Sequence, residues 1–233
     1  MPKDGTQQGG ITDTMRLRLL AVTASIVALL FTAAGVSAAP RDVSKLFRFE
    51  DGRPAGGLSA LVRDGAAGTI SAHIKATHLN RGHAYTYWWV VFNDPSQCLG
   101  GVCGEGDIFL EPGNPAAGFN IEQINAVGIS VLGGNGEIAN NGGRATFTGT
   151  LFEESSVGHD VVIGPGGLVP AGSLLAEGNT MSAEIHILLR DHGPALTGAA
   201  LAAQLSTFGA NCIGMDPDGT YECVEPQFAV HEP

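Results

Sequence analysis

Glu184 and His186 are the two side chains whose types and spacing best suit chemistry. They lie two residues apart in segment 182–190, which alternates apolar and polar residues as a β-strand does. On a strand such residues share a face, with their side chains about 6–7 Å apart at the base. A carboxylate and an imidazole in this arrangement orient one another, share a ligand or transfer a proton. The alternative interpretation is a solvated polar face.

The other histidines suggest a metal site less directly. His73, His78 and His83 are spaced by five, an odd number that puts residues of one continuous strand on opposite faces. A turn at residues 79–82 would bring His78 and His83 together, and either of them could join Glu184 and His186 from a neighbouring strand. The candidate metal ligands are therefore His78, His83 and His186. The sequence leaves both interpretations open: a site for a divalent metal, or histidines at the surface and at strand ends with no cofactor.

Two further groups of residues are candidates for ligand binding. Tyr85, Tyr87 and Trp89 share one face of a single segment, where aromatic rings either stack on sugars or form core under a second layer. Arg190 and His192 come at the end of the alternating segment 182–190, and working residues are often found at strand ends and in loops. The sequence contains no Gly-x-Ser-x-Gly nucleophile motif, which disfavours a serine hydrolase of that type.

Short alternating runs separated by glycine-rich turns predict the elements that position these residues. Segment 84–92 is aromatic and β-branched with two apolar faces, which predicts a central strand covered on both sides. We expect it to form a hairpin with 69–77. Further strands are predicted at 124–132, 144–152, 182–190 and 227–231, a loop at 133–143, and one short helix at 196–205. This pattern predicts an all-β fold, an antiparallel, Greek-key-like β-sandwich with one short helix near the C-terminus.

The N-terminal segment has the three parts of a secretory signal peptide. Arg16 and Arg18 are followed by an apolar run over 19–31 and by small residues up to Ala38, after which we place the cleavage. The apolar run is too short for a comfortable membrane anchor, which needs about 20 residues. Residues 1–14 are polar and featureless, so either Met1 or Met15 is the initiator.

Cleavage defines the predicted organisation: 1–38 is an extension with a signal peptide, and 39–233 is a single secreted domain. The mature domain keeps 9 of the 12 basic residues and 21 of the 23 acidic ones. No basic cluster is present, which argues against nucleic acid as a partner. No later segment is long and apolar enough to insert into a membrane. We expect a protein secreted to the periplasm or the cell exterior, with an unidentified ligand there.

The four cysteines form two close pairs, Cys98 with Cys103 and Cys212 with Cys223. In an exported chain an even count favours disulfides, and adjacent pairing is the simplest of three connectivities. A four-thiolate zinc site is the alternative, but its ligand pairs are usually two to four residues apart.

Two blocks carry a resemblance, Gly-His-Ala-Tyr-Thr-Tyr-Trp-Trp-Val-Val-Phe-Asn at 82–93 and Ala-Glu-Ile-His-Ile-Leu-Leu-Arg-Asp-His-Gly at 183–193. They resemble a family of secreted bacterial proteins without an assigned activity, which implies export and one domain. The architecture also resembles, distantly, the chordin-type and copper/zinc superoxide dismutase sandwiches. The dismutase His-x-His ligand pair is missing here.

Two hypotheses of function follow. The first is a non-catalytic binding or structural β-sandwich that works outside the cytoplasm. The alternative is a metal-dependent or acid/base enzyme that uses Glu184 and His186 with His78 or His83. The two hypotheses differ in one geometric property, because an enzyme or metal site requires these side chains to converge in one pocket.

Overall fold

The computed structural model describes residues 41–114, 117–157, 159, 161–163 and 174–233. All of them belong to one unit, Ala38–Pro233. The predicted signal peptide and its cleavage position near Ala38 lie outside the described residues.

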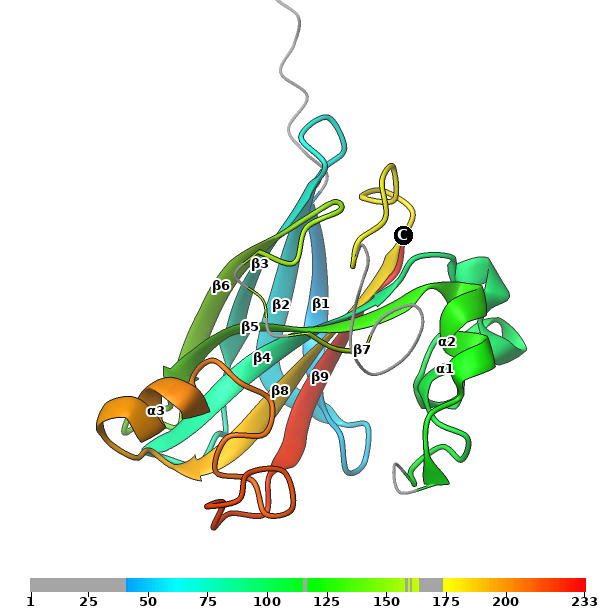
Figure 1. The fold of residues 1–233 in the computed structure, drawn as a ribbon. Helices are drawn as coiled ribbons and strands as arrows, with labels where there is room; N and C mark the ends of the chain where they lie inside the picture. Colours follow the sequence, from blue (N-terminus) through cyan, green and yellow to red (C-terminus); the bar gives the residue numbers. More distant parts are fainter. Residues whose placement is uncertain (1–40, 115–116, 158, 160, 164–173) are drawn as a thin grey trace, which may run out of the picture. The chain divides into compact units, whose positions relative to one another are not determined.

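Nine strands among the described residues form one continuous antiparallel sheet (Figure 1). Their order is β6-β3-β2-β1-β9-β8-β4-β5-β7. The strands are β1 (Arg41–Arg48), β2 (Pro54–Asp64), β3 (Thr69–Ala76), β4 (His83–Phe92), β5 (Ile129–Ile138), β6 (Ala145–Phe152), β7 (Val161–Ile163), β8 (Glu184–Pro194) and β9 (Val224–His231). The predicted all-β antiparallel class is confirmed, and the two layers of the predicted sandwich are the two halves of a single curled sheet.

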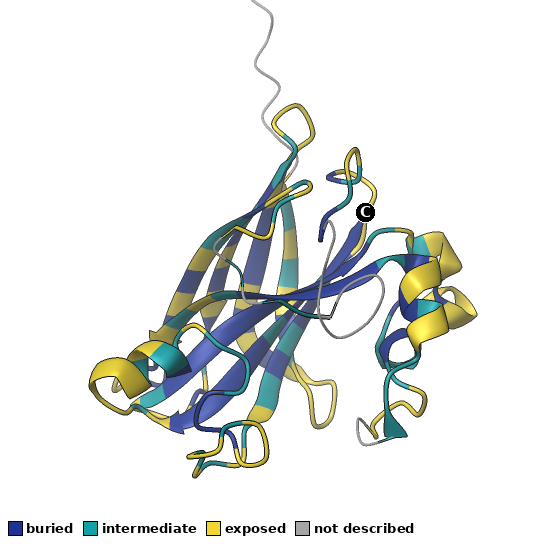
Figure 2. Ribbon diagram, in the orientation of Figure 1, coloured by how far each residue is buried: buried dark blue, intermediate teal, exposed yellow. Residues whose placement is uncertain are grey.

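β4 is an interior strand of the sheet, between β8 and β5, and it is buried along almost its whole length (Figure 2). Both of its faces are covered, as predicted. On the inner face, Tyr87 and Trp89 pack in the main core with side chains from the opposite half of the sheet, such as Ile74 and Phe147. On the outer face, Trp88 and Phe92 pack in a second core. That outer core is closed by the Cys98–Cys103 loop and by the helices α1 (Glu105–Ile108) and α2 (Ile121–Val127).

The predicted hairpin of 69–77 with 84–92 is wrong. β3 pairs with β2 and β6, whereas β4 pairs with β5 and β8. The reason is the difference in polarity between the two segments. β3 buries alternate residues and keeps a wet face, while β4 is apolar on both faces and requires the doubly covered position in the sheet.

The strand predicted at 124–132 is only half correct, because its first part is the helix α2. Asn120 caps this helix by accepting a hydrogen bond from the Gln123 N–H, and Gly128 ends it with a left-handed φ of 69°. β5 then runs to Ile138 through the segment predicted as loop. Gly134 suits this strand because a Cβ there would collide with the ring of Tyr87.

The predicted C-terminal helix is confirmed as α3 (Gly198–Gln204). The two 3₁₀ turns Pro95–Gln97 and Leu99–Gly101, like α1, belong to the disulfide-containing loop after β4 and were not predicted. β1 and β2 were not predicted either. Of the helices in the described part of the chain, none has the length and apolar character needed to span a membrane.

Gly149 on β6 tests how the two halves of the sheet pack against each other. A Cβ at this position would overlap the hydroxyl of Tyr87, which reaches across the core from β4. Gly149→Ala is therefore expected to lower the free energy of unfolding by about 1–3 kcal/mol, measured by urea denaturation. In a Tyr87→Phe background the overlapping oxygen is gone, so the same substitution should cost less.

Gly104→Ala is the matched control, because its backbone is extended and no atom lies within 4 Å of the added Cβ. An equal cost of Gly149→Ala in both backgrounds would contradict this packing.

Candidate functional site

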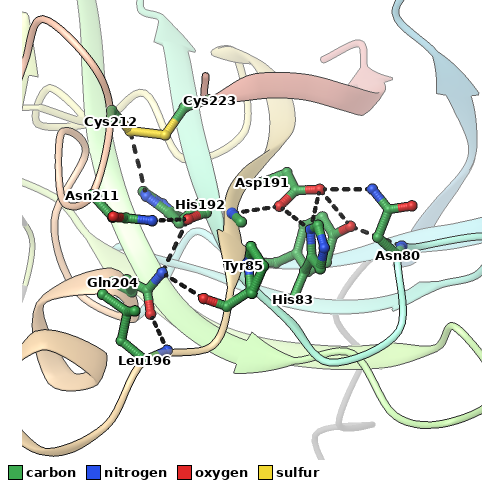
Figure 3. Close-up of polar contacts among 12 residues, drawn as sticks. Asn80, His83, Tyr85, Asp191, His192, Leu196, Gln204, Asn211, Cys212 and Cys223 are labelled. Carbon is green, nitrogen blue, oxygen red and sulfur yellow. Dashed lines mark hydrogen bonds and ion pairs between the residues drawn. A yellow bond between two sulfur atoms is a disulfide. The ribbon is translucent and has the colours of Figure 1, made fainter. Parts of the chain in front are cut away.

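Asp191 is a buried carboxylate at the end of β8, where β4 and the preceding turn bring several donors together (Figure 3). The register of β4 with β8 puts Tyr85 directly opposite Asp191. The carboxylate accepts hydrogen bonds from His83 Nδ1 at 3.0 Å, the Tyr85 hydroxyl at 2.8 Å, Asn80 Nδ2 at 3.2 Å and the Gly193 N–H at 2.8 Å. Four donors from one small region thus satisfy the oxygens of a carboxylate that is buried away from water.

His83 is the member of this group that keeps a chemically available atom. Its side chain is 19% exposed, and because Nδ1 donates to Asp191, the nitrogen left for a proton or a ligand is Nε2. Burial, and then the charge of Asp191, raise the pKa of Tyr85, so this phenol remains a donor. A histidine oriented by a buried carboxylate can act as a general base when a substrate lies within hydrogen-bonding reach.

His192 is fully buried on the opposite face of β8 and both of its ring nitrogens are engaged. Nδ1–H donates to the Ala210 carbonyl at 2.9 Å, and Nε2 accepts from the Thr86 hydroxyl at 2.8 Å. That hydroxyl oxygen in turn accepts from Trp88 Nε1 at 2.7 Å. Burial lowers the pKa of His192, which matches a neutral imidazole. The ring is therefore held in place inside the protein by hydrogen bonds at both of its nitrogens.

His192, Cys212 and Cys223 form the one group of three metal-ligand side chains within the described residues, with ligand atoms within 4.8 Å of one another. Cys212 and Cys223 are joined as a disulfide, and so are Cys98 and Cys103, which confirms the predicted pairing. Metals bind the thiolate, so a disulfide removes two of the three ligands. In this oxidised form the group does not fit a metal ion.

Arg190, a predicted binding residue, is directed toward internal partners. Its guanidinium lies 4.0 Å from the ring centroid of Phe208 and pairs with the carboxylate of Glu225. Only 5% of the residue is exposed, and burial lowers its pKa to about 10. These contacts fasten the disulfide-containing C-terminal segment to β8.

Glu184 and His186 do form the predicted pair, with Oε1 and Nε2 2.7 Å apart. Their side chains are only 10% and 12% exposed, and the Phe92 ring lies 4.8 Å from the imidazole. The face is thus partly covered rather than solvated. Neither His78 nor His83 joins this pair in a group of three metal-ligand side chains among the described residues. The register of β4 with β8 places His83 opposite Pro194, at the other end of β8 from His186.

Ser59, His231 and Asp42 form a triad that the sequence analysis missed. Ser59 Oγ lies 2.8 Å from His231 Nε2, and His231 Nδ1 lies 2.5 Å from Asp42 Oδ2. These are the contacts of a serine nucleophile, base and carboxylate. Here, however, Ser59 is completely buried while Asp42 is the exposed member, so the hydroxyl is closed to a substrate. The triad instead links β1, β2 and β9. β1 and β9 are paired at only two positions, and the hydrogen bond of Asp42 with His231 joins the two strands away from these positions.

Tyr85, Tyr87 and Trp89 are core residues, each at most 1% exposed, so they offer no surface for stacking on a sugar. The curled sheet supplies the second layer that covers them.

Comparison of the chain with protein-family models, curated proteins and solved structures finds no match.

The contacts of Asp191 and the triad were not predicted, for a physical reason. Asp191 lies more than a hundred residues from His83, and Ser59 and Asp42 lie even farther from His231. The only local signal was the position of Asp191 at the end of a predicted strand. The Glu184–His186 contact was predictable because strand geometry alone brings residues two apart together.

The buried neutral state of His192 predicts a dependence of stability on pH. Its pKa in the folded state lies below the unfolded value of about 6.5, so the unfolded chain binds the proton more readily. Its contribution to stability is therefore present above about pH 6.5 and is lost as the pH falls. We expect unfolding free energies measured between pH 7 and pH 5 to decrease for the wild type, with a shallower slope for His192→Gln. The difference is at most about 1.4 kcal/mol per pH unit.

His73→Gln is the matched control, because His73 is exposed on β3. The wild-type slope includes a share from His231, whose pKa is also lowered mainly by burial, and both variants retain that share. A slope in His192→Gln as steep as in the wild type would show that His192 is not held neutral.

Proposed function

We propose that this protein is a non-catalytic binding or structural module that works outside the cytoplasm. Two disulfides are typical of chains that fold in an oxidising compartment, and they agree with the export signal predicted at 1–38. The resemblance of segments 82–93 and 183–193 to secreted bacterial proteins is part of the same proposal.

The observation that carries the proposal is that the Glu184–His186 and His83–Asp191 pairs lie outside the walls of two clefts of the protein. Among the concavities of the described surface are one cleft of about 580 Å³ and one of about 550 Å³. Neither wall includes Glu184, His186 or the His83–Asp191 pair. Catalysis requires acid, base and substrate in one concave site, whereas these side chains are hydrogen-bonded to one another within the sheet.

A second candidate function, a metal-dependent or acid/base enzyme, is favoured by one contact. The 2.7 Å bond between Glu184 Oε1 and His186 Nε2 is the arrangement in which a carboxylate orients an imidazole. For this function a further ligand or a substrate has to reach His186, whose side chain is 12% exposed.

Metal content and two variants decide between the candidates. We expect elemental analysis of the protein, after incubation with zinc or copper and dialysis, to give far less than one metal ion per chain. Glu184→Gln and His186→Ala should each lower the free energy of unfolding by about 1–3 kcal/mol, because they leave a buried partner unsatisfied.

His73→Ala, at an exposed position of another strand, is the control for the loss of an imidazole. One metal ion per chain that is retained in His73→Ala and lost in His186→Ala would replace the binding-module proposal with the metal-dependent one.

A further inference from the structure

The cleft of about 550 Å³ lies where the turn after β3 meets the start of β2 and the loop before β6. We call it the Arg81–Arg144 cleft. Its wall consists of Gly56, Thr77, His78, Leu79, Arg81, Gly142, Gly143 and Arg144.

The charge of this wall is opposite to that of the protein. Its ionisable groups are Arg81, Arg144 and His78, with no carboxylate among the lining residues, in a chain of formal net charge −11. Neither guanidinium forms an ion pair with another described residue, unlike Arg48 with Asp51 or Arg190 with Glu225. Two unpaired arginines in one concavity focus a positive potential there.

The larger cleft lacks this property. Arg41 and Arg63 share its wall with Asp42 and Glu232, so its charges compensate one another. Arg63 is moreover buried, and it donates to the carbonyl oxygens of Thr180 and Ala183. The Arg81–Arg144 cleft is therefore the stronger candidate for an anion.

The cleft is held in shape before any ligand arrives. The Leu79 N–H donates to the Gly143 carbonyl at 3.0 Å, which fixes the turn after β3 to the loop before β6. Asn140 Oδ1 accepts from the Gly142 N–H at 2.8 Å and from the Arg144 N–H at 3.2 Å. A wall fixed by its own hydrogen bonds loses little conformational entropy on binding.

His78 adds a ring nitrogen to the wall of the cleft. Its φ of 60° is in the left-handed region, which is uncommon for a residue other than glycine. The side chain is anchored by Nδ1, which donates to the Ala55 carbonyl at 2.8 Å, so Nε2 is the nitrogen left for a ligand. The turn itself is supported by the buried Gln227, whose Nε2 donates to the Thr77 carbonyl at 2.6 Å.

We propose that the Arg81–Arg144 cleft binds a small dianionic ligand and that the guanidinium groups hold its oxyanion. Planar guanidinium donors match carboxylate and phosphate oxygens, and both chemistries suit the two arginines. This inference rests on the proposed binding function and names the ligand class of the site.

Isothermal titration calorimetry at low ionic strength tests the proposal, with inorganic phosphate and succinate as separate probes. We expect saturable binding of one anion per chain, and the tighter probe identifies phosphate or carboxylate as the preferred oxyanion. Arg81→Ala and Arg144→Ala should each weaken binding by about ten- to a hundredfold, since each removes a charge-assisted contact. Arg144→Lys keeps the charge without the planar donors and should bind with intermediate affinity.

Arg53→Ala is the matched control, because Arg53 is highly exposed, with a side chain 76% accessible, and lies outside the cleft wall. Its affinity should equal that of the wild type, and circular dichroism melts should show every variant folded. Absence of saturable binding of both anions, or an equal loss in Arg53→Ala, would overturn the anion site. That failure differs from failure of the binding-module proposal, which stoichiometric metal dependent on His186 would produce whatever the anion result.

Discussion

Burial of β4 on both faces is the constraint on which the rest of this structure depends. Tyr87 and Trp89 point inward, while Trp88 and Phe92 point outward, and all four are at most 1% exposed. A flat sheet with one covered face would leave half of this apolar area in water, at a cost of about 1.5–3 kcal/mol for each large side chain. The curl of the sheet covers the inner face, and the Cys98–Cys103 loop with α2 covers the outer one. The crossovers between β3 and β4 and between β5 and β6 follow from this requirement.

The same burial determines how polar groups are treated at the ends of the central strands. Asp191 and His192 follow the apolar part of β8 and are still buried. The polar atoms of each side chain therefore need hydrogen-bond partners inside the protein. Asp191 takes donors from β4 and its preceding turn, whereas His192 uses Thr86 and the segment around Ala210. The C-terminal segment with the Cys212–Cys223 disulfide is thereby connected to the sheet by polar contacts, in addition to the packing of Phe208 on Trp88.

The sequence was sufficient for those features that depend on neighbouring residues. Two-residue periodicity located β3, β6 and β8, and it placed Glu184 beside His186. It failed at 124–132, where the capping signals Asn120 and Gly128 favour a helix over the apolar run that suggested a strand. Periodicity could not predict the strand partners or the Ser59–His231–Asp42 triad, because these contacts join residues that are far apart in the sequence. The glycines of β5 suggested a loop for a related reason: Gly134 lacks a side chain because Tyr87 of another strand occupies that space, and Gly136 lies against the backbone of Leu205. No local pattern encodes these contacts.

The triad and the Arg81–Arg144 cleft together show that accessibility to solvent, more than residue type, distinguishes candidate binding residues from structural ones in this protein. Ser59, His231 and Asp42 have the contacts of a hydrolase triad, yet Ser59, whose hydroxyl would have to meet a substrate, is completely buried. Arg81 and Arg144 match no catalytic pattern, but they are exposed, face one concavity and have no carboxylate in that wall to neutralise them. Inside the protein an ionisable group needs a partner, because an unpaired buried charge is strongly destabilising. At the surface of an acidic protein, an unpaired cationic wall attracts anions from solution, most strongly at low ionic strength. The Arg81–Arg144 cleft is therefore a part of the described surface where positive charge is available to an anion from solution.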